Sequence, residues 1–241
     1  MKRTLLLVTA MMFVLGSVLS AAEPVVKKPF NGTNLDGWKF KGKNENCWKV
    51  GNPKADGAAM ELLPLKEGKK GSLINMVDAN WGQANPRKGV DIYTEETFGD
   101  CTIKLEFFIT KKSNSGVYPM GEYEVQISDS FGKPNDTLGQ GDMGAIYSAA
   151  APSTNASKEA GTWQKLEIEF VAPKFDADGH KTANALFKKV ILNGKVVQEN
   201  VQVEKPTGSE LTPKEAPTGP LMLQGNHGPV AFRNIEIIVN Q

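Results

Sequence analysis

The chain has 241 residues and carries 28 Lys and Arg against 27 Asp and Glu, a formal net charge of +1 at pH 7. This balance, with no basic stripe along the chain, argues against nucleic acid and against anionic membrane surfaces as partners. Only two histidines and two cysteines are present, and their spacing does not indicate a zinc site.

Residues 1–22 are typical of a secretory signal peptide. Lys2 and Arg3 give a positive start, residues 5–18 are apolar, and residues 20–22 have the small side chains of a cleavage site. The apolar run is short for a membrane span and no second one follows, so we expect no membrane anchor. We expect an exported protein, periplasmic or extracellular, in which residues 23–241 form a single domain with a sizeable core.

Short strands with frequent turns are expected after the leader. Residues 44–63 predict strands that turn at residues 51–53 and 56–57. Residues 64–92 are irregular and rich in Gly, Asn, Lys and Pro, and we expect a long surface loop there. Residues 100–110 alternate apolar and polar side chains, which predicts an amphipathic strand.

A further strand is predicted at residues 123–127, where three apolar side chains alternate with Glu124 and Gln126. The apolar side chains would face the core, and the two polar ones would face outward. A polar row of this kind can bind sugar hydroxyls, because each hydroxyl both donates and accepts hydrogen bonds. The pattern by itself also fits an ordinary half-solvated strand, which is the commoner case.

The rest of the chain alternates loops with strands and contains no convincing amphipathic helix. Asn193-Gly194 lies between two strand-like runs, which predicts a tight hairpin. Long loops are expected at residues 131–162 and 204–219. The predicted strands are residues 163–171, 185–192, 195–199, 220–224 and 230–239. Many short strands separated by Gly- and Pro-rich turns predict an all-β sandwich.

Cys47 and Cys101 are the two cysteines of the chain. In an oxidising compartment an even pair invites a disulfide, and we predict that their Cα atoms lie within about 7 Å of each other. The alternative is two separate buried thiols, since cysteine outside disulfides is among the most buried residue types.

Several motifs follow one another in a defined order along the chain. The central one is residues 113–130, Ser-Asn-Ser-Gly-Val-Tyr-Pro-Met-Gly-Glu-Tyr-Glu-Val-Gln-Ile-Ser-Asp-Ser, and the others are residues 30–38, 98–107, 161–166, 190–195, 217–228 and 232–235. Together they resemble the 3-keto-disaccharide hydrolase family over nearly all of the chain after residue 28. The resemblance implies an all-β fold, the concanavalin A-like (lectin/glucanase) β-sandwich of jelly-roll type.

The resemblance favours Glu124 as a catalytic acid/base group or metal ligand. His227 lies in a loop, and an imidazole that titrates near neutrality suits proton transfer or the stabilisation of an oxyanion. The alternatives are a solvated glutamate and an ordinary loop histidine. We expect both side chains on one face of the sandwich, within about 10 Å of each other, between walls formed by the loops at residues 64–92 and 131–162.

Further side chains are candidates for binding substrate: Asn114, Tyr118, Trp81, Gln126, Asp129, Gln224 and Arg233. Tyr118 or Trp81 would stack on a sugar ring, and Arg233 would bind a ketone or enolate oxygen. Asp129 has an alternative role as a turn-capping residue, and Arg233 has one as a structural ion-pair partner.

The implied substrate is an oligosaccharide or glycoside with a ketone at C3. The ketone acidifies the hydrogen at C2, so a base can form an enolate, the glycosidic oxygen leaves C1, and water adds back. We assign Glu124 and His227 to the roles of base and oxyanion stabiliser without deciding which is the base. Arg233 or a divalent cation would support the enolate, and no other cofactor is expected. Residues 176–179, Asp-Ala-Asp-Gly, lack the later Glu of a calcium loop and predict a plain turn.

Two other functions are compatible with such a sandwich, a non-catalytic glycan-binding module and a conventional glucanase. A retaining glucanase would place two carboxylates on one strand, whereas this chain has Gln126 where the second would help. The sequence does not determine the oligomeric state.

Overall fold

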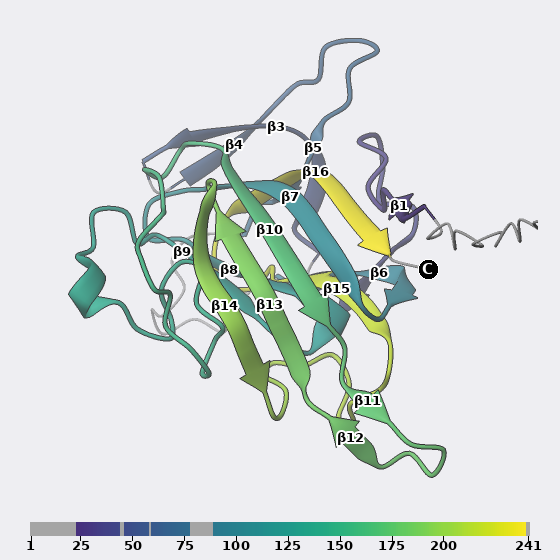
Figure 1. Ribbon diagram of the computed structural model, residues 1–241. Helices are drawn as coiled ribbons and strands as arrows, with labels where there is room; N and C mark the ends of the chain where they lie inside the picture. The colour runs from purple at the N-terminus through teal and green to yellow at the C-terminus, as the bar shows by residue number, and fades with distance from the viewer. Residues whose placement is uncertain (1–22, 44–45, 58, 78–88, 240–241) are drawn as a thin grey trace, which may run out of the picture.

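The computed structural model describes residues 23–43, 46–57, 59–77 and 89–239 (Figure 1). The predicted signal peptide and Trp81 lie outside these residues. Within them the chain consists of β-strands and loops, with two short 3₁₀ segments, η1 (Pro119–Gly121) and η2 (Asn135–Thr137). Neither of these segments has the length and apolar character needed to cross a membrane.

Two antiparallel sheets lie one behind the other in Figure 1. The larger sheet has the strand order β14 (Lys195–Val203), β13 (Ala185–Leu192), β10 (Gln164–Val171), β7 (Cys101–Ile109), β16 (Val230–Val239), β5 (Ser72–Asn75), β3 (Trp48–Asp56) and β4 (Ala59–Leu63), with β1 (Val25–Lys27) paired to β16. The smaller sheet has the order β2 (Trp38–Lys41), β6 (Asp91–Phe98), β15 (Gly219–Leu223), β8 (Asn114–Tyr118) and β9 (Val125–Ser128). A hairpin of β11 (Lys174–Phe175) and β12 (Lys181–Ala183) projects from the sandwich (Figure 1).

The hydrophobic core lies between the two sheets. Ile103, Leu105 and Phe107 of β7 are at most 3% exposed, and Val125 and Ile127 of β9 are fully buried in the same cluster. In each strand every second side chain points into this cluster, as the alternation in the sequence predicts. The predicted all-β sandwich of jelly-roll type is confirmed.

The hairpin between β13 and β14 is also confirmed. Asn193 and Gly194 both have positive φ, 51° and 84°, the backbone that a two-residue hairpin turn requires. The side chain of Asn193 has a second task, because its Nδ2 donates to the carbonyl oxygen of Ala156 at 2.8 Å. The turn therefore also anchors the long loop that precedes β10.

Two predictions for the first third of the chain are wrong. Residues 64–92 are not one surface loop, because they contain the buried strand β5, which pairs with β16 and β3. The expected turn at residues 51–53 is part of β3. Position 51 of β3 is occupied by glycine because a Cβ there would lie only 1.9 Å from Cδ1 of Leu62. Close strand packing, rather than a turn, requires the glycine.

The predicted disulfide is absent: Cys47 and Cys101 are not joined. Cys101 is buried at the start of β7, opposite Phe170 of β10 and Val239 of β16. Cys47 is half-buried, just before β3, and its carbonyl oxygen accepts the N–H of Met76 at 2.9 Å. The alternative of two separate cysteines is therefore the one that the structure supports.

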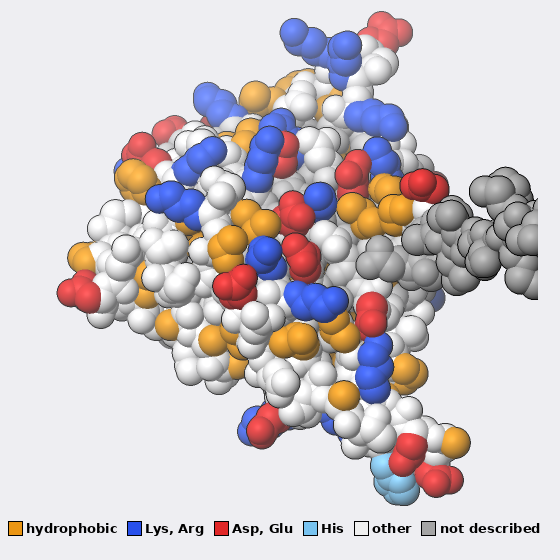
Figure 2. All heavy atoms as spheres, in the orientation of Figure 1, with side chains coloured by type: hydrophobic (Ala, Val, Ile, Leu, Met, Phe, Trp, Pro, Cys, Tyr) orange, Lys and Arg blue, Asp and Glu red, His pale blue; other side chains and the backbone are white. Residues whose placement is uncertain are grey.

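The outer face of the large sheet carries paired charges. On adjacent strands, Lys104 Nζ lies 3.2 Å from Glu167 Oε1, and Arg233 Nη2 lies 2.7 Å from Glu106 Oε2. Figure 2 shows basic and acidic side chains interleaved across this face. Exposed pairs of this kind contribute about 0.2–1 kcal/mol each, and the face has the character of a solvated sheet surface.

Candidate active site

A polar cavity of about 280 Å³ lies against the small sheet. Its lining residues are Asn114, Tyr118, Glu124, Gln126, Gly141, Tyr147, Ser209, Gln224 and His227. Six of them are candidates named from the sequence, although they come from distant parts of the chain. The cavity is therefore the candidate active site.

Two strands and the segment after β15 bring these side chains together. β8 and β9 pair with Gly116 opposite Gln126, and the N–H of Gln224 donates to the carbonyl oxygen of Gly116 at 3.0 Å. Glu124 and Gln126 flank Val125, whose side chain is fully buried in the core. Both polar side chains consequently point to the opposite face of the small sheet, where the cavity lies.

Glu124 is buried, which corrects the expectation of a solvent-facing carboxylate. Glu124 is only 3% exposed. A Cβ on Gly116 would lie 2.2 Å from Glu124 Oε1. The carboxylate thus fills the space above the glycine backbone. Burial raises the pKa of Glu124 to about 7, a hydrogen bond from Tyr118 lowers it in part, and the charge of Asp91 raises it again. A carboxyl with this pKa is present in both protonation states near neutrality, which suits acid/base chemistry.

A hydrogen-bonded chain links Gln224, Tyr118 and Glu124. Gln224 Nε2 donates to the Tyr118 hydroxyl at 3.1 Å, and that hydroxyl bonds to the Glu124 carboxylate. Among the described residues, no donor contacts Oε1 of Glu124, Gln126 or Gln224. A buried oxygen without a donor costs about 1–3 kcal/mol. Three such oxygens around one cavity indicate a site that accepts hydrogen bonds from a bound molecule.

His227 is positioned by a loop that is fastened to the large sheet. Asn75 Nδ2, from β5, donates to the carbonyl oxygens of Gly225 and Gly228 at 2.8 and 2.9 Å. His227 itself is 8% exposed, and its Nδ1 is hydrogen-bonded to Oδ1 of Asn226. These contacts fix both the loop and the ring, so the imidazole has one orientation relative to the cavity.

The chain matches known proteins over nearly its whole length. The model of one family, described as the 3-keto-alpha-glucoside-1,2-lyase-like domain and also as 3-keto-disaccharide hydrolase, matches residues 26–238. The chain belongs to this family. This confirms the resemblance inferred from the ordered motifs and supports an enzyme of the glycoside hydrolase type.

Solved structures agree with this assignment. A candidate glycosyl hydrolase from Parabacteroides distasonis ATCC 8503 is 27% identical, with a TM-score of 0.57, and the match covers 92% of this chain and 93% of that chain. Two further candidate glycosyl hydrolases from the same organism are 18% and 22% identical, with TM-scores of 0.54 and 0.51. Their matches cover 90% and 87% of this chain and 94% and 97% of those chains, and they show the shared fold. No curated protein matches the chain.

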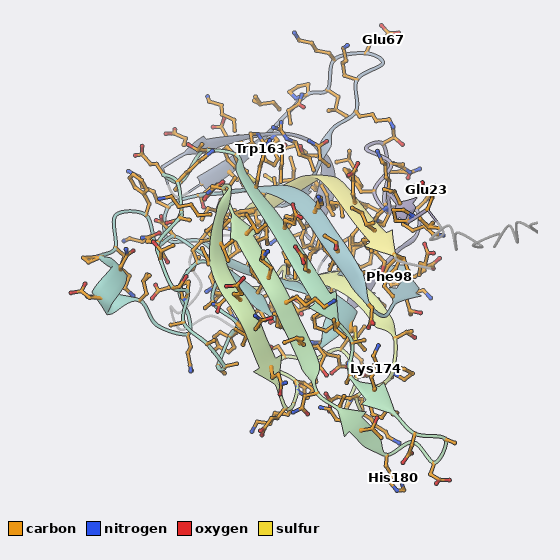
Figure 3. The ribbon with its side chains drawn as sticks, in the orientation of Figure 1. Glu23, Glu67, Phe98, Trp163, Lys174 and His180 are labelled. Atoms are coloured by element: carbon orange, nitrogen blue, oxygen red, sulfur yellow. The ribbon has the colours of Figure 1, made fainter. Side chains whose placement is uncertain are left out.

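Two sequence candidates of this family member lie away from the cavity, and a third is outside the described residues. Asp129 is exposed, and its Oδ2 accepts a backbone N–H at 2.9 Å from the turn before β8, so it caps a turn. Arg233 lies on β16 in the large sheet, opposite Glu106, and its guanidinium stacks 3.9 Å from the ring centroid of Trp163. Figure 3 labels Trp163, which directly precedes β10. The expected substrate contact of Arg233 is therefore replaced by the structural ion pair. Trp81 lies outside the described residues.

The structure adds residues that the sequence did not single out. Tyr147 is 39% exposed and lines the cavity, together with Gly141 and Ser209. Tyr118, by contrast, is 1% exposed, so it presents its hydroxyl rather than a ring face. Tyr147 lies in the loop at residues 131–162, within a short apolar run at residues 144–149. Such a run inside a long loop is the signal that would have found it.

The two loops expected to form walls behave differently. The loop at residues 131–162 does supply wall residues of the cavity. No described residue of the segment 64–92 lines it. The second wall instead comes from the loop between β14 and β15, which contributes Ser209.

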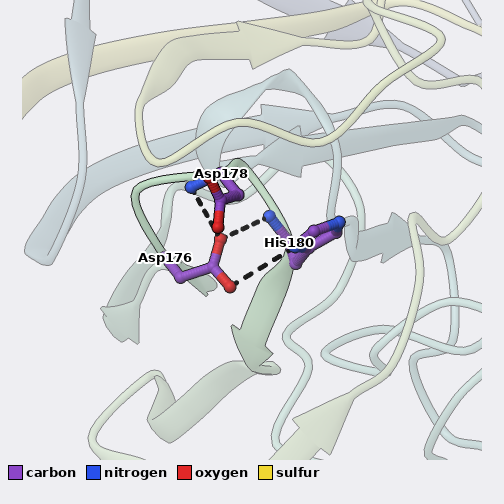
Figure 4. A group of neighbouring side chains, drawn as sticks. All are labelled: Asp176, Asp178 and His180. Atoms are coloured by element: carbon purple, nitrogen blue, oxygen red, sulfur yellow. Dashed lines mark hydrogen bonds and ion pairs between the residues drawn. The ribbon is translucent and has the colours of Figure 1, made fainter.

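One group of acidic and imidazole side chains lies elsewhere. Among the described residues, Asp176, Asp178 and His180 are the one set of three or more such side chains with ligand atoms within 4.8 Å of one another. All three are exposed on the β11–β12 hairpin (Figure 4). Asp176 Oδ1 accepts the N–H groups of Asp178 and His180 at 3.0 and 2.8 Å. This is a capped turn, as the sequence predicted.

Proposed function

We propose that the protein cleaves the glycosidic bond of a 3-keto-glycoside by elimination at C1 followed by addition of water. The observation that carries the proposal is Glu124, a buried carboxyl with a pKa of about 7 in a cavity lined by polar side chains. A general base works best when its pKa lies near the operating pH. Glu124 therefore suits the removal of a proton beside a ketone.

The proposed steps use Glu124 twice. Its carboxylate takes the proton from C2, and the electron pair of the C–H bond forms an enolate with the C3 ketone. The C1–O bond then breaks, and the leaving oxygen takes the proton from Glu124. Water adds across the C1–C2 double bond and restores the 3-keto sugar, so the net reaction is hydrolysis.

The other cavity residues have supporting roles. His227, in its protonated form, donates to the enolate oxygen and offsets the charge that develops there. The amide oxygens of Gln126 and Gln224 accept hydrogen bonds from sugar hydroxyls, which satisfies acceptors that otherwise lack donors. Tyr118 holds the carboxylate through its hydroxyl and keeps Glu124 directed at the substrate.

A divalent cation is the alternative means of stabilising the enolate. The donor set of the cavity is compatible with such an ion, because it offers the Glu124 carboxylate, the His227 imidazole and the amide oxygens of Gln126 and Gln224. A bound cation would supply positive charge beside the enolate oxygen. Activity measured after chelation, and again after the addition of Mg²⁺, Mn²⁺ or Ca²⁺, distinguishes the two versions.

A conventional retaining glucanase fits the site less well. Such enzymes need two carboxyl groups about 5–5.5 Å apart on either side of the bond, and Glu124 is the one carboxyl among the described residues that line the cavity. Glu122 is also buried, and its pKa is raised to about 7 by burial. However, the Glu122 carboxyl accepts the Thr212 hydroxyl and lies outside the cavity lining.

One assay separates the three functions. Purified protein is incubated with an aryl 3-keto-glucoside and with its unoxidised parent. Release of the aryl group from the keto form alone is the expected result. Release from both would identify a conventional glycosidase, and binding without release would identify a glycan-binding module.

We also propose that the protein is exported and that residues 1–22 are removed. The support is the sequence alone: a basic start, an apolar run and a small-residue cleavage site. N-terminal sequencing of the protein expressed in a bacterial host checks this. A chain that retains Met1 in the cytoplasmic fraction would contradict it.

A further inference from the structure

A second cavity of about 620 Å³ adjoins the first. The two cavities share Tyr147 in their linings, and consecutive residues of one loop divide between them. Ser209 lines the first cavity, while Gly208 and Glu210 line the second. The two cavities are therefore neighbouring parts of one cleft, with Tyr147 at the boundary.

Tyr147 is placed beside Glu124 by strand pairing. An antiparallel bridge joins Val125 to Ile146, so the residues next to them, Glu124 and Tyr147, are opposite each other. The N–H of Tyr147 donates to the carbonyl oxygen of Glu124 at 3.0 Å. Side chains that lie opposite each other on antiparallel strands project to the same face. The aromatic ring and the proposed base therefore share one side of the sheet.

The segment that carries Tyr147 is held at both ends. Gln198 Nε2, from β14, donates to the carbonyl oxygens of Gly144 and Ala150 at 3.0 and 3.3 Å. The N–H of Gln126 also donates to the carbonyl oxygen of Ala145 at 2.9 Å. The ring of Tyr147 thus stands on a fixed support, as a stacking platform requires, since a preorganised contact surface loses little entropy on binding.

The opposite wall of the second cavity is also tied to the proposed base. Thr207 Oγ1 accepts the N–H of Glu124 at 2.8 Å, and the N–H of Thr207 donates to the carbonyl oxygen of Glu122 at 3.1 Å. Both polar backbone groups of Glu124 are consequently bonded to residues that line the second cavity. The distance between the reacting group and this cavity is set by direct hydrogen bonds.

Size and chemistry indicate what the second cavity binds. Small-molecule sites have volumes of about 300–1,000 Å³, and the first cavity alone, at about 280 Å³, lies below that range. The second is lined by polar groups that include Gln202, Glu204, Lys205 and Thr207. With Glu210 it has two acidic side chains against one basic, so a neutral hydroxylated ring fits better than an acidic sugar.

We infer that the second cavity binds the leaving sugar of the substrate, with Tyr147 packed against that sugar where the two cavities meet. This inference rests on the proposed function, which places the 3-keto ring beside Glu124. It makes Tyr147 a residue that determines specificity: the protein prefers a second neutral ring over a small alkyl leaving group.

The test compares methyl 3-keto-α-glucoside, which has no second ring, with a 3-keto-disaccharide whose leaving group is a neutral hexose. Calorimetry on Glu124→Gln protein measures binding without turnover. The disaccharide is expected to bind at least about fivefold more tightly, since truncation of an aromatic anchor costs about 1 kcal/mol or more. Tyr147→Ala is expected to remove this preference, so that the two ligands bind with equal affinity, and Tyr147→Phe to retain it.

Two further variants support the comparison. Phe131→Ala removes an aromatic side chain that is 56% exposed and lines neither cavity, so the preference should persist. Gln202→Ala alters the second cavity without touching the first, so only the disaccharide should bind more weakly. Equal affinity for the two ligands, or a preference that survives both Tyr147→Ala and Gln202→Ala, would overturn the second site alone. No binding of either ligand, with no turnover by the wild-type protein, would overturn the proposed function and this inference together.

Discussion

The carboxylate of Glu124 occupies the space that a side chain on Gly116 would need. An ideal Cβ at residue 116 would lie 2.2 Å from Glu124 Oε1 and 2.8 Å from its Cδ. Gly116 has no Cβ, so the carboxylate can lie directly over β8, within reach of Tyr118. One glycine on one strand therefore sets the position of the proposed base on the next.

Gly116→Ala is accordingly expected to displace the carboxylate without removing it. A misplacement of about 1 Å can cost about 100-fold in rate, so we expect a loss of that order in kcat/KM on an aryl 3-keto-glucoside. Gly139→Ala is the matched control, because its Cβ would meet nothing nearer than Asp142 Oδ2 at 3.7 Å. Equal activity of both variants would show that the position of Glu124 is not critical.

Glu124→Gln is expected to lower kcat about 100- to 10,000-fold, the usual contribution of a general acid/base group. Asp129→Asn changes a nearby exposed carboxylate that caps a turn outside the cavity, and it should retain activity. Initial rates of the two variants at pH 7, with circular dichroism spectra to verify folding, provide the comparison. Near-normal turnover by Glu124→Gln would show that the Glu124 carboxyl takes no part in the reaction.

Stability should depend on pH through the same carboxyl. Glu124 has a pKa of about 7 in the fold, against an ordinary value of 4.5 for an exposed glutamate. Between these pH values the folded state therefore holds a proton that the unfolded state releases. The stabilising contribution is full below pH 4.5 and is lost as the pH rises through 7. As the pH rises from 4.5 to 8, the free energy of unfolding of the wild type should fall by up to about 3 kcal/mol relative to that of Glu124→Gln, at about 1.36 kcal/mol per pKa unit. Urea unfolding of both proteins at pH 4.5 and 8 measures this, and a constant difference would indicate an unshifted carboxyl.

Tyr118→Phe is expected to raise the pKa of Glu124 further. The Tyr118 hydroxyl lowers this pKa by bonding to the carboxylate, because a hydrogen bond to the charged form favours that form. The acidic limb of the kcat profile should therefore move to higher pH in the variant. Values of kcat measured between pH 5 and 9 show this shift. An unchanged pH profile would show that the Tyr118 hydroxyl does not affect the ionisation of Glu124.

Cys101 should resist modification in the folded protein. Burial, and to a lesser extent the charge of Asp100, raises the pKa of its thiol to about 12, so almost no reactive thiolate is present at pH 8. Iodoacetamide is expected to label Cys101 only after denaturation. Mass spectrometry of unreduced, denatured protein should then show both cysteines labelled. A mass without added label would instead demonstrate the disulfide that the fold lacks.

Local patterns in the sequence were sufficient for much of the fold. The alternation at residues 100–110 and 163–171 corresponds to β7 and β10, and Asn193-Gly194 forms the hairpin turn. These features depend on side-chain periodicity and turn conformation, which neighbouring residues set. Strand β5 was missed because its four residues lie within a stretch rich in Gly, Asn and Lys, and pairing with β16 and β3 decides its conformation.

For the site, the sequence determined which residues share a face, and the tertiary structure determined what covers that face. A period of two placed Glu124 and Gln126 together, but it did not show that the segment with Tyr147 and the loop with Thr207 would bury them. Burial is what brings the pKa of Glu124 to about 7, and it results from contacts between residues far apart in the chain. Arg233 illustrates the same limit. Its strand is part of the large sheet, and its guanidinium forms an ion pair with Glu106 on the neighbouring strand. Alternation along a strand is a local property, whereas the partner strand and the covering loop are decided only when the whole chain packs.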